Sequence, residues 1–292
     1  MKVRFLGVRG SIPTPGPETA RYGGNTSCLT VEHDDALLIL DAGTGIRKLG
    51  LELAQRGGGQ TYHLLLTHTH WDHIQGFPFF VPSFIPGNTI HIYGLPPLDK
   101  PLDVVLKGQM DPEYFPVALG EIAAKFVVHD LREANFSLGP YKIRRSYMNH
   151  PGVTLGYRIE AGGRTFVFAT DNEPFRHLYE DVPAPAQPDK TYGRTRDNDL
   201  IPFISDADLL VADAQYTVEE YKTRMGWGHS SYAAAVGIAI QGRAKRLALF
   251  HLDPMHADEE IDRHVFDAQS RARARGSALE IFAAREGETV EV

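Results

Sequence analysis

His68-Thr69-His70-Trp71-Asp72-His73 follows directly after the apolar run Leu64-Leu65-Leu66-Thr67, so four potential metal ligands lie within six residues at the end of a predicted strand. Side chains at positions i and i+2 of an extended segment point the same way, so His68 and His70 can bind one cation. Where the chain turns toward a helix, Asp72 and His73 can face a second cation beside the first. An exposed polar loop is the alternative. The ends of buried strands are, however, where α/β sheets place their sites, and the stretch predicts a metal centre.

Three further ligand-type residues stand at the ends of predicted strands elsewhere in the chain. His150 follows a strand-like segment over 141–149, Asp171 follows 164–170, and His251 follows 246–250. Each of them alone would more simply be a turn residue or a helix cap. Their joint occurrence beside the histidine cluster indicates that distant segments converge on one centre, where the carboxylate of Asp171 can bridge two cations.

The composition excludes several classes of protein. A chain of 292 residues, 42% hydrophobic and 23% charged, is globular and can bury a large core. No run approaches the roughly 18 apolar residues of a membrane span, and the first seven residues are too short for a secretory signal, so we predict no membrane association and a cytoplasmic location. Cys28 is the single cysteine, which excludes an internal disulfide and zinc sites built on several thiolates. The net charge of −7 argues against coating nucleic acid.

Apolar runs alternate with helical patterns along most of the chain, which indicates two α/β portions. Strands are predicted at 2–8, 26–32, 36–40, 63–67, 165–170, 208–212 and 246–250, and helices at 44–54, 217–224, 232–241 and 259–275. Two segments near 95–115 and 173–200 are rich in proline and charge, so we expect surface excursions there. The second, which with its exit reaches Pro202, has too much proline for a regular element and is either a lid or a long loop.

The ordered set of His68, His70, Asp72 and His73, then His150, Asp171 and His251, resembles the metallo-β-lactamase superfamily, in its ribonuclease Z-like and phosphodiesterase branch. The resemblance covers nearly the whole chain. It implies an α/β fold in four layers, an αββα sandwich in which two mixed sheets pack face to face with helices outside, as one domain over 1–292. It also implies that one divalent ion is held by His68, His70 and His150 and another by Asp72, His73 and His251, with Asp171 between them.

A second match lies in Gly226-Trp227-Gly228-His229-Ser230-Ser231, at the start of the predicted helix over 232–241. It resembles the segment of ribonuclease Z-like enzymes whose histidine protonates the leaving oxygen. Asp213 ends an apolar strand, and it either orients His229 or caps a helix near Thr217. With Asp72, these two residues are the predicted catalytic set.

This ligand set suits phosphodiester hydrolysis. Two divalent ions roughly 3.5–4 Å apart lower the pKa of a water and clamp phosphate oxygens, and a histidine can supply the proton for the leaving oxygen. Zinc is the first choice, with manganese or iron also compatible, because no thiolate ligand narrows the selection. A homodimer is a common arrangement in this superfamily.

The substrate is predicted to be a small phosphodiester such as a cyclic nucleotide. Ribonuclease Z grips transfer RNA with a basic arm, whereas the excursion at 173–200 carries more acidic than basic residues. RNA processing, glyoxalase II-like thioester hydrolysis and a non-catalytic metal or nucleotide sensor remain alternatives. Class B β-lactamases usually have a cysteine where Asp171 stands, which argues against β-lactam hydrolysis.

Two further features receive weaker interpretations. The glycine-rich stretch over 7–26, with Arg9 and Arg21, either presents backbone N–H groups and a cation to a phosphate or is a turn-rich connection between strands. The remaining histidines are expected to have surface or core roles only: His33, His63, His91, His129, His177, His256 and His264.

Overall fold

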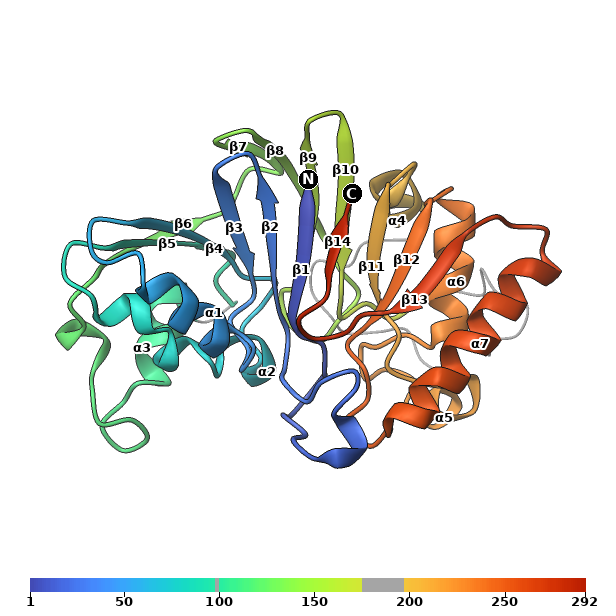
Figure 1. Ribbon diagram of the computed structural model, residues 1–292, viewed down its shortest axis with the longest axis horizontal. Coiled ribbons are helices and arrows are strands. Elements are labelled where there is room, and N and C mark those ends of the chain that lie inside the picture. Colours follow the sequence, from blue (N-terminus) through green and yellow to red (C-terminus); the bar gives the residue numbers. More distant parts are fainter. Residues whose placement is uncertain (98–99, 175–196) are drawn as a thin grey trace.

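The strands form two seven-stranded sheets in a computed structural model that describes residues 1–97, 100–174 and 197–292 (Figure 1). The first sheet has the order β14 (Thr289–Glu291), β1 (Lys2–Gly7), β2 (Cys28–His33), β3 (Ala36–Leu40), β4 (Thr61–Leu65), β5 (Thr89–Gly94), β6 (Lys125–Asp130). The second has the order β13 (Glu280–Ala283), β12 (Arg246–Phe250), β11 (Leu209–Asp213), β10 (Arg164–Ala169), β9 (Leu155–Ala161), β8 (Tyr141–Tyr147), β7 (Asn135–Leu138).

Both sheets are mixed. Strands β3 to β6 run parallel in the first sheet and β10 to β13 run parallel in the second, while the remaining neighbours are antiparallel. The carboxyl ends of parallel strands in one sheet meet at a common edge, where α/β folds place their sites. The segments that follow β4, β10, β11 and β12 therefore emerge at shared edges of the two sheets.

Helices cover the outer faces of the sheets. Their bounds are α1 (Ile46–Ala54), α2 (Trp71–Ile74), α3 (Leu102–Gly108), α4 (Asp197–Ile204), α5 (Val218–Thr223), α6 (Tyr232–Gln241) and α7 (Asp258–Ala274). In Figure 1, α1 and α3 lie on the side of the first sheet, whereas α6 and α7 lie on the side of the second. The predicted αββα sandwich is thus confirmed. Within the described residues, no helix combines the length and the apolar character that crossing a bilayer requires.

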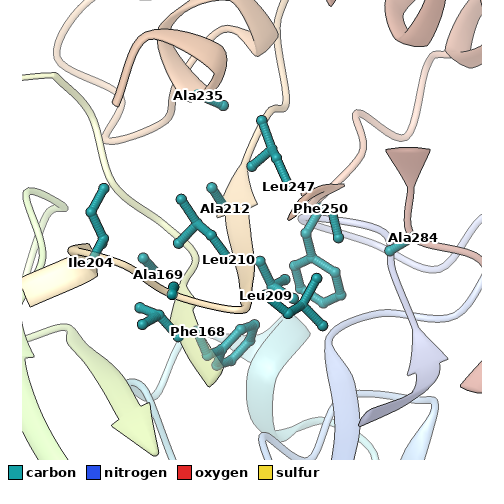
Figure 2. Close-up of a cluster of buried hydrophobic side chains, with 14 of the residues drawn as sticks. Phe168, Ala169, Ile204, Leu209, Leu210, Ala212, Ala235, Leu247, Phe250 and Ala284 are labelled. Carbon is teal, nitrogen blue, oxygen red and sulfur yellow. The ribbon is translucent and has the colours of Figure 1, made fainter. Parts of the chain in front are cut away.

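Two buried apolar clusters hold these layers together. The larger joins the inner faces of both sheets and continues under α6 and α7. Figure 2 shows part of it, including Phe168 of β10 and Phe250 of β12, whose ring centroids are 5.4 Å apart. The smaller packs α1 and α3 onto the outer face of the first sheet, through residues such as Ile46 and Leu106. Burial of a Leu, Ile or Phe side chain contributes about 1.5–3 kcal/mol relative to exposure, so these clusters fix the strand register around the site.

Most predicted elements agree with the structure, and the two expected excursions are the exception. The bounds of β3, β12 and α6 are those predicted. Residues 95–115, however, contain α3, whose Leu102 and Leu106 are buried in the smaller cluster. The end of the segment at 173–200 belongs to α4, which includes Pro202 because burial of Leu200 and Phe203 outweighs one lost backbone hydrogen bond. Residues 175–196, which include His177 and most of the predicted lid, lie outside the described residues.

Candidate metal centre

The predicted ligands come together at the carboxyl edge of the sheets as two triads. His68, His70 and His150 each offer one ligand atom within 4.8 Å of the others, and Asp72, His73 and His251 do the same. These are the two triads that the family resemblance implies. All of these side chains except that of His70 are buried.

The carboxylate of Asp171 lies between the two triads. Its Oδ2 atom is 3.9 Å from His68 Nε2 and 3.8 Å from His150 Nε2 on one side. On the other side, Oδ1 is 3.3 Å from His73 Nε2, and Oδ2 is 3.3 Å from His251 Nε2. The Asp171 carboxylate is therefore within reach of both triads, which is the geometry that a bridging ligand needs.

The second ring nitrogen of several histidines has a fixed partner. Asp41 Oδ2 lies 2.7 Å from His73 Nδ1, the carbonyl of Gly228 lies 2.9 Å from His150 Nδ1, and Gln215 Oε1 lies 3.1 Å from His251 Nδ1. Such acceptors hold one proton on Nδ1, so Nε2 is the nitrogen that can bind a metal once the ring is neutral. The rings are therefore oriented for coordination before any ion binds.

Three residues of the site share an unusual backbone conformation. Asp41, Asp171 and His251 follow β3, β10 and β12 with φ angles of 59°, 51° and 58°. The left-handed region costs a non-glycine residue about 1–3 kcal/mol and persists where surrounding structure enforces it, often at functional sites. The same backbone turn thus follows three strands that deliver side chains to this site.

Electrostatics divide the histidines into two groups. Burial lowers the pKa of His150 to about 3 and holds the pKa of His68 well below its usual range, so both rings are neutral. Burial also opposes protonation of His251, but nearby carboxylates, chiefly that of Asp171, outweigh it and raise its pKa to about 9. The pKa of His73 is raised in the same way, against burial, by Asp171 and its neighbours.

Metal binding is therefore expected to release protons. A histidine must be neutral to coordinate, so His73 and His251, protonated at pH 7 in the metal-free chain, each give up one proton. Metal affinity should rise with pH. The part of this rise that comes from loss of the His251 proton should end above about pH 9, where the ring is already neutral. Calorimetric zinc titration in two buffers of different ionisation enthalpy would measure the release. Heats at pH 7 that do not depend on the buffer would contradict this expectation.

His229 lies beside the second triad and is held by Asp213. Its Nδ1 atom is 2.8 Å from Asp213 Oδ2, and its ring stacks on that of His251 with centroids 4.8 Å apart. Asp213 Oδ1 accepts the backbone N–H of Ser230 at 2.8 Å. Of the two roles open for Asp213, the structure therefore supports orientation of His229. The N-cap of α5 is Thr217, so Asp213 does not cap this helix.

Sequence reasoning missed Glu173 as part of the site scaffold. Its buried carboxylate accepts the N–H groups of Gly226 at 2.7 Å and Gly228 at 2.9 Å, and it accepts the hydroxyl of Tyr221 at 2.8 Å. Gly228 has a φ of 88°, and a Cβ at this position would lie 2.3 Å from His150 Nδ1. Glu173 and Gly228 together fix the loop that carries His229. No signal in the sequence separated Glu173 from the acidic residues that follow it.

The glycine-rich segment over 7–26 is a connection whose cations are already engaged. Arg9 is fully buried, and it donates to the carbonyls of Gly23, Asp253 and His256 at 2.7–3.0 Å. Arg21 pairs with Asp262 at 2.7 Å. Neither arginine is free to meet a phosphate. The segment still contributes to the site, because the N–H of Ser11 donates to Asp72 Oδ2 at 2.7 Å.

Close packing at Gly10 leads to a testable expectation. A Cβ on Gly10 would lie 2.4 Å from the ring of His251, which is buried and has no room to move. Gly10→Ala should therefore destabilise the fold by about 1–3 kcal/mol and reduce the zinc content. Gly16→Ala is the matched control, because nothing lies within 4 Å of a Cβ there. Thermal unfolding and metal analysis of both variants would test this, and equal behaviour would contradict it.

The fold and this side-chain cluster define a protein of the four-layer αββα class with a candidate metal centre at the sheet edge. The profile of a family described as "Beta-lactamase superfamily domain" matches residues 37–252, so the chain belongs to the β-lactamase superfamily. The expected membership of the metallo-β-lactamase superfamily is thereby confirmed.

Individual relatives cover the chain nearly end to end. A ribonuclease Z from Haloarcula marismortui is 28% identical over 92% of this chain and 93% of its own length. Among solved structures, the metallo-β-lactamase fold protein YhfI from Bacillus subtilis is 20% identical, with a TM-score of 0.67 over 100% of this chain and 99% of its own. The short form of human tRNase Z is 18% identical, with a TM-score of 0.63 over the same shares. The two structures show likeness of fold.

Proposed function

We propose that this metallo-β-lactamase family hydrolase cleaves phosphodiester bonds at a centre of two divalent ions, with zinc as the expected metal. The observation that carries the proposal is the pairing of His229 with Asp213 directly beside the metal-ligand cluster. A ligand cluster alone would suit many hydrolytic reactions. An oriented histidine next to it supplies what the departing oxygen of a phosphodiester needs, namely a proton.

The residues present fit two cations. Among the described residues, His68 Nε2 is buried and has no hydrogen-bond partner, an arrangement that costs free energy unless an ion binds there. The cluster combines imidazoles with the carboxylates of Asp72 and Asp171, whose pKa values are held low against burial by nearby histidines. Divalent ions at this centre would lower the pKa of a water and clamp phosphate oxygens.

The proton transfer can be followed on the chain's own atoms. In the protonated state of His229, the Nδ1–H group donates to Asp213 Oδ2, and the proton on Nε2 is free for the substrate. Transfer of the Nε2 proton to the leaving oxygen returns a neutral ring that keeps its Nδ1 proton. The negative charge of Asp213 stabilises the imidazolium form before the transfer and holds the ring orientation throughout.

Exposed indoles beside the site favour a substrate that carries a nucleobase. Trp71 directly follows His70 and is 79% exposed, and Trp227 lies two residues before His229 and is 61% exposed. An exposed indole offers a flat face on which a base can stack. Stacking on an aromatic ring contributes about 1–3 kcal/mol per base. A small nucleotide phosphodiester such as a cyclic nucleotide remains our preferred substrate.

RNA is the second candidate, because curated relatives that cover more than 90% of the chain are named ribonuclease Z. A cyclic nucleotide and an RNA differ in size, but the bond that is cleaved is a phosphodiester in both. The segment over 173–200 carries more acidic than basic residues, which disfavours RNA, but most of this segment lies outside the described residues.

Turnover assays separate the candidates. The zinc-loaded protein would be assayed on bis(p-nitrophenyl) phosphate, on 2′,3′- and 3′,5′-cyclic nucleotides, on a transfer RNA precursor and on a thioester. We expect diester turnover, with cyclic nucleotides preferred. Cleavage of the RNA alone would establish the second candidate, and turnover of the thioester alone would overturn the phosphodiesterase proposal. Full metal content without any turnover would favour a sensor.

A further inference from the structure

A second cluster of ligand-type side chains lies at the start of α7, away from the centre described above. His256 lies two residues before Asp258, where the helix begins, and Glu260 and His264 lie on the helix one turn apart. Each of the three offers a ligand atom within 4.8 Å of the others. His256 is 3% exposed and His264 is 6% exposed, so both rings are almost removed from water.

The hydrogen bonding of His256 leaves one nitrogen without a partner. Its Nε2 atom lies 2.9 Å from Glu220 Oε1, and that carboxylate stays ionised because hydrogen bonds from Thr217 and His256 outweigh burial and lower its pKa to about 2. Because a carboxylate can only accept, Nε2 donates its proton to Glu220. Among the described residues, the buried Nδ1 atom has no hydrogen-bond partner. A histidine that donates one ring N–H to a carboxylate and presents its other nitrogen bare is the usual state of a metal ligand.

The other two side chains complete a donor set. His264 packs edge-on against His256, with centroids 4.8 Å apart, and burial lowers its pKa to about 4, so its ring is neutral and carries a lone pair. Glu260 is half-buried and connects the cluster to solvent. Two histidines and a glutamate form a known set of three protein ligands for zinc, in which a water takes the fourth position.

We propose that His256, Glu260 and His264 form a further binding site for a divalent transition metal ion such as zinc, separate from the centre at the sheet edge. The two sites share no residue, and this inference does not depend on the proposed function. The site joins the start of α7 to the segment that follows His251, where Arg9 Nη1 donates to the carbonyl of His256 at 2.7 Å. Its ion would therefore stabilise the fold.

Metal counting tests the proposal. Protein saturated with zinc and then desalted is expected to hold three ions per chain, and His264→Gln and Glu260→Gln are each expected to hold two. Asp171→Asn, which disrupts the first centre, should retain the third ion. Glu259→Gln is the matched control on the same helix, because Glu259 is exposed and pairs with Arg21.

A thermal measurement keeps the test independent of activity. In the Asp171→Asn background, zinc should raise the unfolding temperature, and adding His264→Gln or Glu260→Gln should abolish that rise. The half-buried Glu260 gives the decisive variant if the buried His264 proves necessary for folding. Two ions per wild-type chain, or three in Glu260→Gln, would overturn the proposal, as would a zinc-induced rise that survives both substitutions.

Discussion

Asp171→Asn is expected to lower kcat/KM by about 10³-fold or more and to release zinc from the centre. The carboxylate lies within 3.9 Å of a ring nitrogen of His68, His73, His150 and His251, so it faces both triads. Metal ions contribute several kcal/mol of charge stabilisation in such reactions, and each 1.36 kcal/mol corresponds to about a factor of ten in rate. Metal analysis and steady-state kinetics would measure both effects.

Asp206→Asn is the matched control for this substitution. Asp206 has a φ of 56°, close to the 51° of Asp171, and asparagine tolerates this left-handed conformation. It pairs with Arg243 on the surface, away from the centre. The control should retain its metal and its activity, so that a loss confined to Asp171→Asn reports on the lost charge. Full activity and full metal content in Asp171→Asn would contradict the bridging role.

The sequence predicted the parts of the site that depend on strand ends. His68, Asp171 and His251 each follow an apolar run, and the run marks the strand while the polar residue marks its carboxyl end. Asp171 and His251 follow parallel strands of the second sheet and so lie at one edge, whereas His68 follows β4 of the first sheet and reaches them because the two sheets pack face to face. The dense spacing of the first motif then left few alternatives to a metal centre.

The strand-end pattern did not identify the residues that hold the ligand side chains in place. Asp41 also follows a strand, Ala36–Leu40, and the same signal could have found it, but it stands alone in sequence without a neighbouring ligand motif. Gln215 and Glu173 hold His251 and the His229 loop through contacts between segments about 36 and 53 residues apart. Such pairings arise from packing, which a one-dimensional pattern does not encode. The helix α3 was missed for a similar reason, because its burial depends on the sheet beneath it.

His229→Ala removes the proposed proton donor. Loss of a general acid typically lowers the rate by about 10²–10⁴-fold, and the loss should depend on the substrate. A cyclic nucleotide expels an alkoxide that needs a proton, whereas bis(p-nitrophenyl) phosphate expels a stable phenolate that does not. The defect should therefore be large for the first substrate and small for the second, with metal content unchanged. Equal defects on both would indicate a structural role for His229.

Asp213→Asn tests what the carboxylate of Asp213 contributes to His229. The amide has one oxygen, which can accept either from the N–H of Ser230 or from His229 Nδ1, and the substitution also removes the negative charge that stabilises the imidazolium. The variant should retain bis(p-nitrophenyl) phosphate turnover and lose much of its cyclic nucleotide turnover, with metal content unchanged. Cyclic nucleotide turnover equal to that of the wild type would mean that the proton comes from elsewhere in the site.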